Sequence, residues 1–223
     1  MSDLVIFDLD GVLVDTQEAE NGGLAHLSEL MGLPIDPNRA RELFSGRKMQ
    51  ECVDLIAELA RTPPPPDAVS IARARCEELI GTRLDPIDGV YDALNALAVP
   101  RCVASNSPRD LIVKRLRAAG VLHHFGDRLF SAYDVGAWKP DPRLFLQAAA
   151  ACDSHPERCV VVEDSEVGVE AALAAGMRVL QYTADPGTPP HRRDAVTFSS
   201  MRALPALVAS ADTAPPNPHP DPQ

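Results

Sequence analysis

VIFDLDGVLVDT, residues Val5–Thr16, is the stretch that decides the fold. It continues a wholly apolar run that begins at Leu4 and stops at Asp8, and a second acid follows at Asp10. A short run that is apolar at every position is typical of a strand buried on both faces, as in a parallel sheet covered by helices. Such a strand needs no acids at its end for stability. The stretch therefore predicts an α/β fold whose first strand ends in functional carboxylates.

The second half of the chain alternates between strand-like and helix-like patterns. Ser165 is placed to begin one helix, and Gly120 and Gly176 are placed to end two of them. Strands that alternate with helices form βαβ units, so we expect a doubly wound parallel sheet, a Rossmann-like core, with helices on both faces. The strand patterns cover 101–106, 128–134, 158–164 and 177–183, and the helical patterns cover 90–99, 108–120, 140–152 and 165–176.

An inserted all-helical segment interrupts this alternation after the first strand. Apolar residues recur at helical spacing in 23–33, 51–60 and 68–80, and the proline run Thr62–Pro66 separates the last two helices. The insert is joined to the rest of the chain by two linkers, which would allow it to move as a cap.

The expected domain boundaries follow from these patterns. We expect an α/β core formed by residues 1–16 and 85–211 and a helical cap formed by residues 17–84. Residues 212–223 are polar and proline-rich, which predicts a disordered tail.

Composition excludes several classes of protein. The 223 residues are 45% hydrophobic and carry a formal net charge of −11, which argues against binding to nucleic acid or an anionic membrane. No apolar run approaches the roughly 20 residues of a membrane span, and the first residues do not resemble a signal peptide. The five cysteines are odd in number and form no C-x-x-C pair, as expected of reduced thiols. We expect a cytoplasmic protein.

Polar residues follow three of the predicted strands. Because the carboxyl ends of parallel strands meet at one edge of a sheet, these side chains are expected to converge there. Several carboxylates in one place repel each other by several kcal/mol, so a cation is needed among them. Oxygen ligands without His or Cys favour a hard divalent ion, usually Mg²⁺. The residues at the strand ends are Asp8, Asp10, Ser105, Asn106, Glu163 and Asp164, with Lys139 in a loop before a helix.

Four segments resemble the motifs of the haloacid dehalogenase-like hydrolase superfamily, and they occur in the same order. They read FDLDGVLVDT, VASNS, WKPD and VVEDSEVGVEAALAAGM, and the resemblance covers about Leu4–Asp185. The insert between the first two motifs is similar to the helical type of cap in this superfamily. The resemblance implies phosphoryl transfer through an aspartyl-phosphate, with Mg²⁺ required.

The resemblance also implies a role for each residue that carries the reaction. Asp8 matches the nucleophile, and Asp10 matches the general acid and base that serves the leaving oxygen and the attacking water. Ser105 matches a hydrogen-bond donor to the phosphate, with the backbone of Asn106 nearby. Lys139 matches the residue that offsets the charge of the phosphate and the nucleophile.

The metal ligands come from the same resemblance. Asp164 matches the Mg²⁺ ligand, beside Asp8 and the backbone carbonyl of Asp10, and Glu163 would act through a water. The ion would serve as template and charge neutraliser.

Other details favour a phosphatase over related activities. Two aspartates in the first motif favour a phosphatase or mutase over a dehalogenase. Members of the β-phosphoglucomutase branch usually carry a His soon after the DT of the first motif and an Arg in the cap. Here Glu20 lies in that first segment with no His before His26, and Met49 stands at the arginine position. CVASNSP, LFSAYDVGAWKPDP and AAGMRVLQYTADP are similar to bacterial sugar phosphatases that act on 6-phosphogluconate.

The basic cap turn FSGRK is the candidate for substrate selection. Arg47 and Lys48 would bind a second anionic or polyhydroxyl group of the substrate, and the alternative is a solvated basic turn. The sequence thus predicts a Mg²⁺-dependent phosphatase whose partner is a small sugar or sugar-acid phosphate. The alternatives are a phosphosugar mutase and a non-catalytic binding protein on the same scaffold. The second alternative predicts that a motif residue is lost, and none is.

Overall fold

The computed structural model describes residues 2–44, 47, 49–81 and 84–210. These residues divide into two compact units, which are described separately. The first unit comprises the described residues of Met1–Asp8, Asp88–Arg109 and His123–Gln223, and the second comprises those of Leu9–Ile87 and Asp110–Leu122. In the described residues, no helix has both the length and the apolar character required to cross a membrane.

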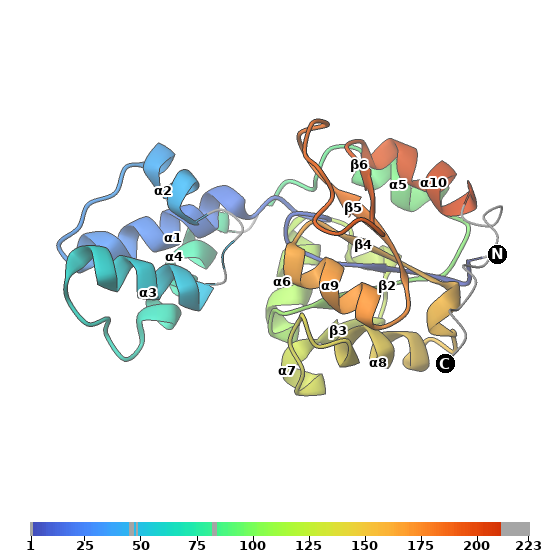
Figure 1. The fold of residues 1–223 in the computed structure, drawn as a ribbon, viewed down its shortest axis with the longest axis horizontal. Helices are drawn as coiled ribbons and strands as arrows, with labels where there is room; N and C mark the ends of the chain where they lie inside the picture. The colour runs from blue at the N-terminus through green and yellow to red at the C-terminus, as the bar shows by residue number, and fades with distance from the viewer. Residues whose placement is uncertain (1, 45–46, 48, 82–83, 211–223) are drawn as a thin grey trace, which may run out of the picture. The chain divides into compact units, whose positions relative to one another are not determined.

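An all-parallel sheet forms the centre of the first unit, as predicted, and it has six strands (Figure 1). Its order is β3-β2-β1-β4-β5-β6, so the chain runs outward in opposite directions from β1 and β4. Ligands of such sheets bind beyond the carboxyl ends of the strands at this switch point. The strands are β1 (Leu4–Phe7), β2 (Arg101–Ser105), β3 (Leu129–Ser131), β4 (Cys159–Glu163), β5 (Arg178–Tyr182) and β6 (Val196–Phe198).

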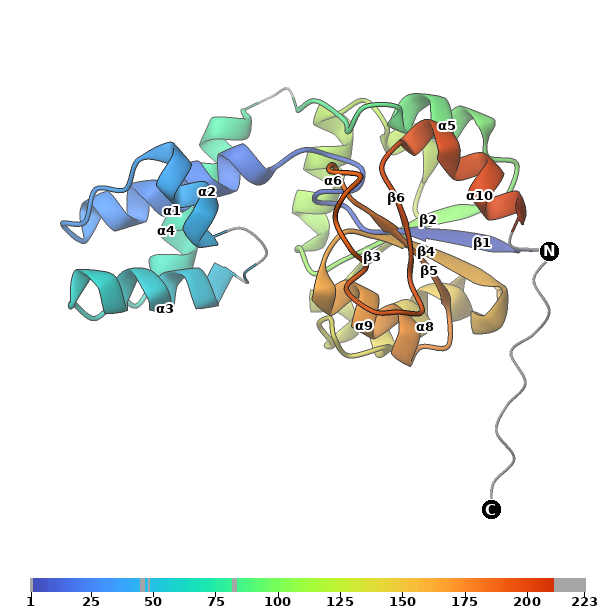
Figure 2. The ribbon, with the colours of Figure 1, turned by 45° about the horizontal axis from the view of Figure 1, so that its top comes forward.

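Helices cover both faces of this sheet, which confirms the doubly wound fold. Leu4 and Ile6 of β1 share a buried cluster with Leu144 and Val169, which belong to α8 (Arg143–Ala151) and α9 (Glu166–Ala174). Figure 1 and Figure 2 show α5 (Val90–Ala96) and α10 (Leu204–Ser210) on the other face. Residues two apart in a strand point to the same face, so a wholly apolar β1 is what two covered faces require.

The first unit departs from the predicted elements in two places. The pattern at 128–134 was expected to be strand throughout, but only β3 is strand, and α7 (Ala132–Val135) follows it directly. The Ser131 hydroxyl accepts a hydrogen bond from the Tyr133 N–H at 3.1 Å and so starts the helix. The short β6 and α10 were missed. The unit also contains 3₁₀ helices at Pro156–Arg158 and Met201–Ala203, and part of a third at Leu122–His124.

The second unit is helical, and it has a core of its own. Leu27, Phe44 and Ile56 are among the buried residues of that core. The segment α2 was not predicted, because its sequence PNRARELF is mostly polar. The helices are α1 (Gln17–Leu30), α2 (Pro37–Phe44), α3 (Met49–Ala60) and α4 (Ala68–Ile80), and most of α6 (Arg109–Ala118) belongs to this unit.

The helices α1 and α4 approach each other at a glycine. A Cβ atom added to Gly23 would lie 2.3 Å from the carbonyl oxygen of Ala72, so only glycine permits this packing. The compact unit also includes residues 9–16 and most of α6, which lie outside the predicted cap of residues 17–84. The cap and core boundaries stay a prediction, and the predicted tail at 212–223 lies outside the described residues.

Candidate active site

The first cluster of functional side chains lies at the carboxyl ends of β1 and β4. The Lys139 Nζ atom is 2.5 Å from Oδ1 of Asp8 and 2.6 Å from Oε1 of Glu163. Burial alone would lower the pKa of Lys139, but the two carboxylates outweigh burial and raise it above its ordinary value. The lysine is therefore a buried, charged group. We call Asp8, Lys139, Glu163 and Asp164 the strand-end cluster.

The loop that carries Lys139 is fixed by residues from two other elements. The Asn106 side chain accepts a hydrogen bond from the Lys139 N–H at 2.9 Å. The Phe145 ring of α8 lies beneath the ammonium group, with Nζ 5.0 Å from the ring centroid. Asn106 was expected to contribute its backbone to substrate binding, and its side chain has this additional positioning role.

Glu163 is completely buried, and the protein satisfies both of its carboxylate oxygens. Its Oε2 accepts hydrogen bonds from the N–H groups of Asp164 and Ser165 at 2.9 and 3.0 Å and from the Ser165 hydroxyl at 2.9 Å. The Ser165 Oγ also accepts from Gly168 N–H, which confirms Ser165 as the N-cap of α9. A Cβ on Gly168 would lie 1.8 Å from Glu163 Oε1, so the carboxylate uses space that only glycine leaves open.

The carboxylates of this cluster suit a divalent cation. Ligand oxygens of Asp8, Glu163 and Asp164 all lie within 4.8 Å of one another. Burial and the carboxylates of Glu163 and Asp8 raise the pKa of Asp164 well above its ordinary value, although Lys139 opposes the rise. One ammonium does not balance three carboxylates, and hard oxygen ligands match Mg²⁺. Asp10 belongs to the second unit, and its predicted backbone contact with the ion stays a prediction.

Ser105 lies where the sequence placed it, at the carboxyl end of β2. This strand is the neighbour of β1, with Val103 opposite Phe7. The Ser105 side chain is buried, and its Oγ accepts a hydrogen bond from Ser107 N–H at 3.1 Å. Its role as a donor to phosphate stays a prediction.

A residue that the sequence reasoning missed also contacts this cluster. His191 Nε2 lies 3.0 Å from the backbone oxygen of Asp164, and His191 N–H donates to Gln181 Oε1 at 2.8 Å. The next residue, Arg192, pairs with Glu166 of α9 at 2.8 Å. These contacts anchor the loop that follows β5 to the beginning of α9. No sequence motif marks His191.

The second cluster lies within the second unit, around Arg115 of α6. Its Nη1 is 2.6 Å from Asp10 Oδ1, and its Nε and Nη2 donate to Oε1 of Glu77 on α4 at 3.1 and 2.9 Å. Glu20 of α1 is 3.8 Å from Nη1, and Lys114 also pairs with Glu77, at 2.6 Å. We call Asp10, Glu20, Glu77, Lys114 and Arg115 the Arg115 cluster. Asp10, expected to transfer protons, is thus held by residues that the sequence reasoning did not select.

Charge within the Arg115 cluster is largely compensated. Burial alone would lower the pKa of Arg115, but the three carboxylates around it outweigh burial and raise it. Burial first, and the Asp10 charge second, raise the pKa of Glu20 to about 7, against the opposing effect of Arg115. The Thr16 hydroxyl contacts both acids, at 3.1 Å from Asp10 Oδ1 and 3.2 Å from Glu20 Oε1.

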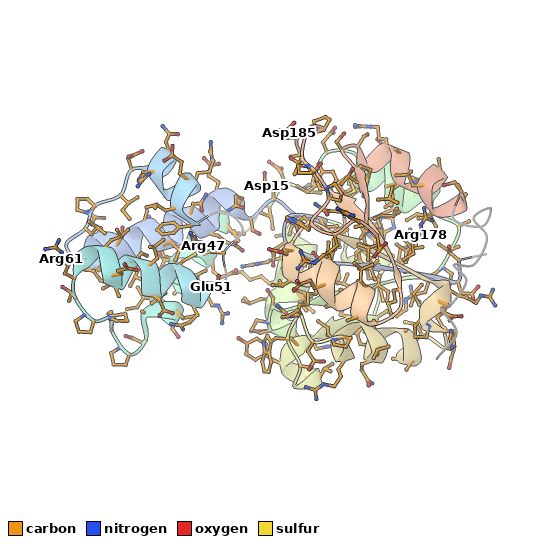
Figure 3. All side chains as sticks on the ribbon, in the orientation of Figure 1. Asp15, Arg47, Glu51, Arg61, Arg178 and Asp185 are labelled. Carbon is orange, nitrogen blue, oxygen red and sulfur yellow. The ribbon has the colours of Figure 1, made fainter. Side chains whose placement is uncertain are left out.

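The predicted substrate-selecting turn is only partly described. Arg47 is exposed, and its Nε donates to the carbonyl of Leu43 at 2.9 Å, at the end of α2 (Figure 3). Lys48 lies outside the described residues. Substrate binding by both residues stays a prediction.

Comparisons with known proteins extend the resemblance that the sequence motifs indicate. The model of the haloacid dehalogenase-like hydrolase family matches residues 2–176. The chain is 35% identical to the 6-phosphogluconate phosphatase of Escherichia coli (strain K12) over 205 residues, 91% of this chain and 93% of that protein. It is 32% identical to the beta-phosphoglucomutase of Bacillus subtilis (strain 168) over 187 residues, 78% and 80% of the two chains. A solved structure of a haloacid dehalogenase-like protein from Agrobacterium tumefaciens is similar with a TM-score of 0.82 and 33% identity, over 95% of this chain and 100% of that one.

Proposed function

Because this chain belongs to the haloacid dehalogenase-like hydrolases, we propose that it is a Mg²⁺-dependent phosphatase of small sugar or sugar-acid phosphates, such as 6-phosphogluconate. The observation that carries the proposal is the strand-end cluster. A carboxylate at the switch point of the sheet, Asp8, contacts a buried lysine and shares its surroundings with two further acids. A positioned carboxylate beside a fixed positive charge supports the proposed in-line attack on a phosphate.

The first half of the proposed reaction transfers the phosphoryl group to the protein. A carboxylate oxygen of Asp8 attacks phosphorus, the bond from phosphorus to the sugar oxygen breaks, and an aspartyl-phosphate forms. Asp10 gives its proton to the leaving oxygen. Two residues of chain span at most roughly 7 Å, so covalent geometry alone keeps Asp10 near Asp8.

The second half regenerates the enzyme. Water attacks phosphorus, Asp10 accepts a proton from that water, and the Asp8–phosphorus bond breaks to release inorganic phosphate. Lys139 offsets the negative charge that Asp8 and the phosphate bring together, and Ser105 donates a hydrogen bond to a phosphate oxygen. A bound Mg²⁺, held by Asp8 and Asp164, would supply charge neutralisation and a template for the phosphate.

The test is phosphate release from a panel of sugar and sugar-acid phosphates, with and without Mg²⁺. We expect release from at least one of them, with 6-phosphogluconate among the best, and loss of release in the Asp8→Asn variant. No release from any compound, or equal release by Asp8→Asn, would contradict the proposal. Release that requires Asp8 also excludes the non-catalytic alternative.

The phosphosugar mutase remains the second candidate, because the chain is 32% identical to a beta-phosphoglucomutase. The residues around Glu20 and Met49 argue against it, since they depart from the mutase pattern. Incubation with β-glucose 1-phosphate and a bisphosphate primer separates the two. Free phosphate should appear faster than glucose 6-phosphate, and the reverse order would favour the mutase.

A further inference from the structure

Arg115 contacts three segments of the second unit that are far apart in the sequence. Its guanidinium reaches Asp10, which follows β1, Glu77 on α4 and, at a longer distance, Glu20 on α1. Its side chain is only 7% exposed, and it lies on the same buried face of α6 as Ile112 and Leu116. A charged residue at a buried position needs partners of opposite charge, and the acids supply them.

Stability alone does not account for an arginine at this position. Replacement of a buried ion pair by apolar residues of similar volume is often neutral or stabilising, so such a pair is weak support for a purely structural role. The two edges of the guanidinium also have different partners. Nε and Nη2 both bond to one oxygen of Glu77, whereas Nη1 bonds to Asp10 Oδ1. The planar fork therefore holds Asp10 at a fixed distance from α4.

The two acids that bond to the Arg115 guanidinium are also held by other groups. Glu77 is held a second time by Lys114, at 2.6 Å, and α4 packs on α1 at the close contact of Gly23 with Ala72. Thr16 supplies a second donor to Asp10 Oδ1 at 3.1 Å. The Asp10 carboxylate is consequently held from two directions by groups with little freedom.

We propose that Arg115 is a positioning residue for the proton-transfer group: its Nη1 orients the Asp10 carboxylate, and Glu77 on α4 anchors the guanidinium that does so. This rests on the proposed function, in which Asp10 protonates the leaving oxygen and later accepts a proton from water. Arg115 itself exchanges no proton and forms no covalent bond in the reaction. Its effect is to keep the Asp10 oxygens where both transfers occur.

The experiment compares two substrates that differ in their need for an acid. A sugar phosphate releases a basic alkoxide that must be protonated, whereas 2,4-dinitrophenyl phosphate releases a stable phenolate that needs no proton. The parameter kcat/KM reports the first phosphoryl transfer, and kcat also includes the second half, in which Asp10 acts as base. In Arg115→Ala we expect kcat/KM to fall about 10- to 100-fold for the sugar phosphate and less than about 3-fold for the aryl phosphate, with kcat lowered for both.

Lys114→Ala is the matched control. It removes a positive charge from the same helix and from the same Glu77, with which its Nζ pairs at 2.6 Å. Because Glu77 is also held by Arg115, we expect a selective loss much smaller than in Arg115→Ala. Arg115→Lys keeps the charge but lacks the planar set of donors with which Arg115 orients Asp10 and contacts Glu77, so it should recover only part of the loss.

Three outcomes would overturn the proposal. One is an equal fall in kcat/KM for both substrates, another is no fall for either, and the third is the same selective loss in Lys114→Ala. Where Arg115→Ala does not fold, as judged by circular dichroism, Arg115→Lys and Glu77→Gln must show the same selective loss, at smaller size. If the wild type releases no phosphate, the proposed function fails; if it does and the variants are unselective, only the role of Arg115 fails.

Discussion

Each unit of this protein contains a buried cation surrounded by three carboxylates, but the two clusters differ in how the charges are matched. In the strand-end cluster a single ammonium, Lys139, contacts Asp8 and Glu163. In the Arg115 cluster a planar guanidinium faces all three acids, and Lys114 adds a second positive charge. Lysine is a point charge, whereas arginine presents several donors in a fixed plane.

The difference indicates what each cluster is built to do. The third acid of the strand-end cluster, Asp164, has a raised pKa because buried carboxylates lie around it, and this excess negative charge suits a metal ion. The Arg115 cluster carries most of its own counter-charge, so it suits the orientation of a carboxylate better than the binding of an ion. The predictions below separate these two roles, from the largest expected effect to the smallest.

Asp8→Asn should abolish phosphate release from every substrate, by about 10³-fold or more, because the amide is not a nucleophile. The loss should be independent of the leaving group, in contrast to the selective loss expected in the Arg115 cluster. Steady-state assays with a sugar phosphate and 2,4-dinitrophenyl phosphate measure this. Retention of activity on the aryl phosphate would contradict a nucleophilic role.

Gly168→Ala should reduce activity by about 10²-fold, because the added Cβ would lie 1.8 Å from Glu163 Oε1 and displace that carboxylate from Lys139. Helix propensity alone predicts a benefit, because replacing a glycine inside a helix by alanine should raise stability by about 1 kcal/mol. Activity assays and thermal unfolding distinguish the two effects. Ala174→Gly, at an exposed position of the same helix, should lower stability and leave activity unchanged.

Removal of Mg²⁺ should suppress activity, and the concentration that restores half of it should depend on the strand-end cluster alone. Asp164→Asn is expected to raise this concentration about tenfold or more, because an amide is a weaker ligand than a carboxylate. Glu77→Gln should not change it. Titration of chelator-treated protein with Mg²⁺ provides the measurement, and an equal shift in both variants would remove the distinction between the clusters.

The last prediction concerns stability and not activity: a pH dependence of unfolding that arises from Glu20. Its pKa is raised from 4.5 to about 7, first by burial and then by the charge of Asp10. A raised carboxyl pKa stabilises the fold fully below about pH 4.5, and this contribution is lost as the pH rises through 7. The stability of Glu20→Gln relative to the wild type should therefore increase as the pH rises from 4.5 to 7. A difference in Tm that does not change with pH would refute the assignment.

Much of the strand-end cluster was predictable because it consists of short segments at successive strand ends. A buried strand followed by acids is visible in Val5–Thr16, and the order of the motifs fixes which strand ends matter. Gly168 left a weaker signal, since a glycine inside a helix usually marks a close approach. His191 left none, because its contact with Asp164 depends on how a long loop returns to the sheet.

The Arg115 cluster was not predicted, because its contacts join residues 38 and 105 positions apart and no sequence motif marks Glu77 or Arg115. The available signal is that Arg115 lies on the apolar face of α6, together with Ile112 and Leu116. An arginine on such a face requires a buried acid, but several acids of the helical segment satisfy that requirement equally well in sequence. Only the packing of α1, α4 and α6 selects Glu77 and Asp10.

The proposed reaction requires Asp8 to be the phosphorylated residue. Rapid acid quench during turnover of a sugar phosphate, followed by proteolysis and mass spectrometry, tests this directly. One phosphoryl group should be found on Asp8, should disappear when substrate is exhausted, and should accumulate in Arg115→Ala, where hydrolysis of the intermediate is slowed. Phosphate released without any phosphorylated peptide, or with the phosphoryl group on another residue, would contradict the account.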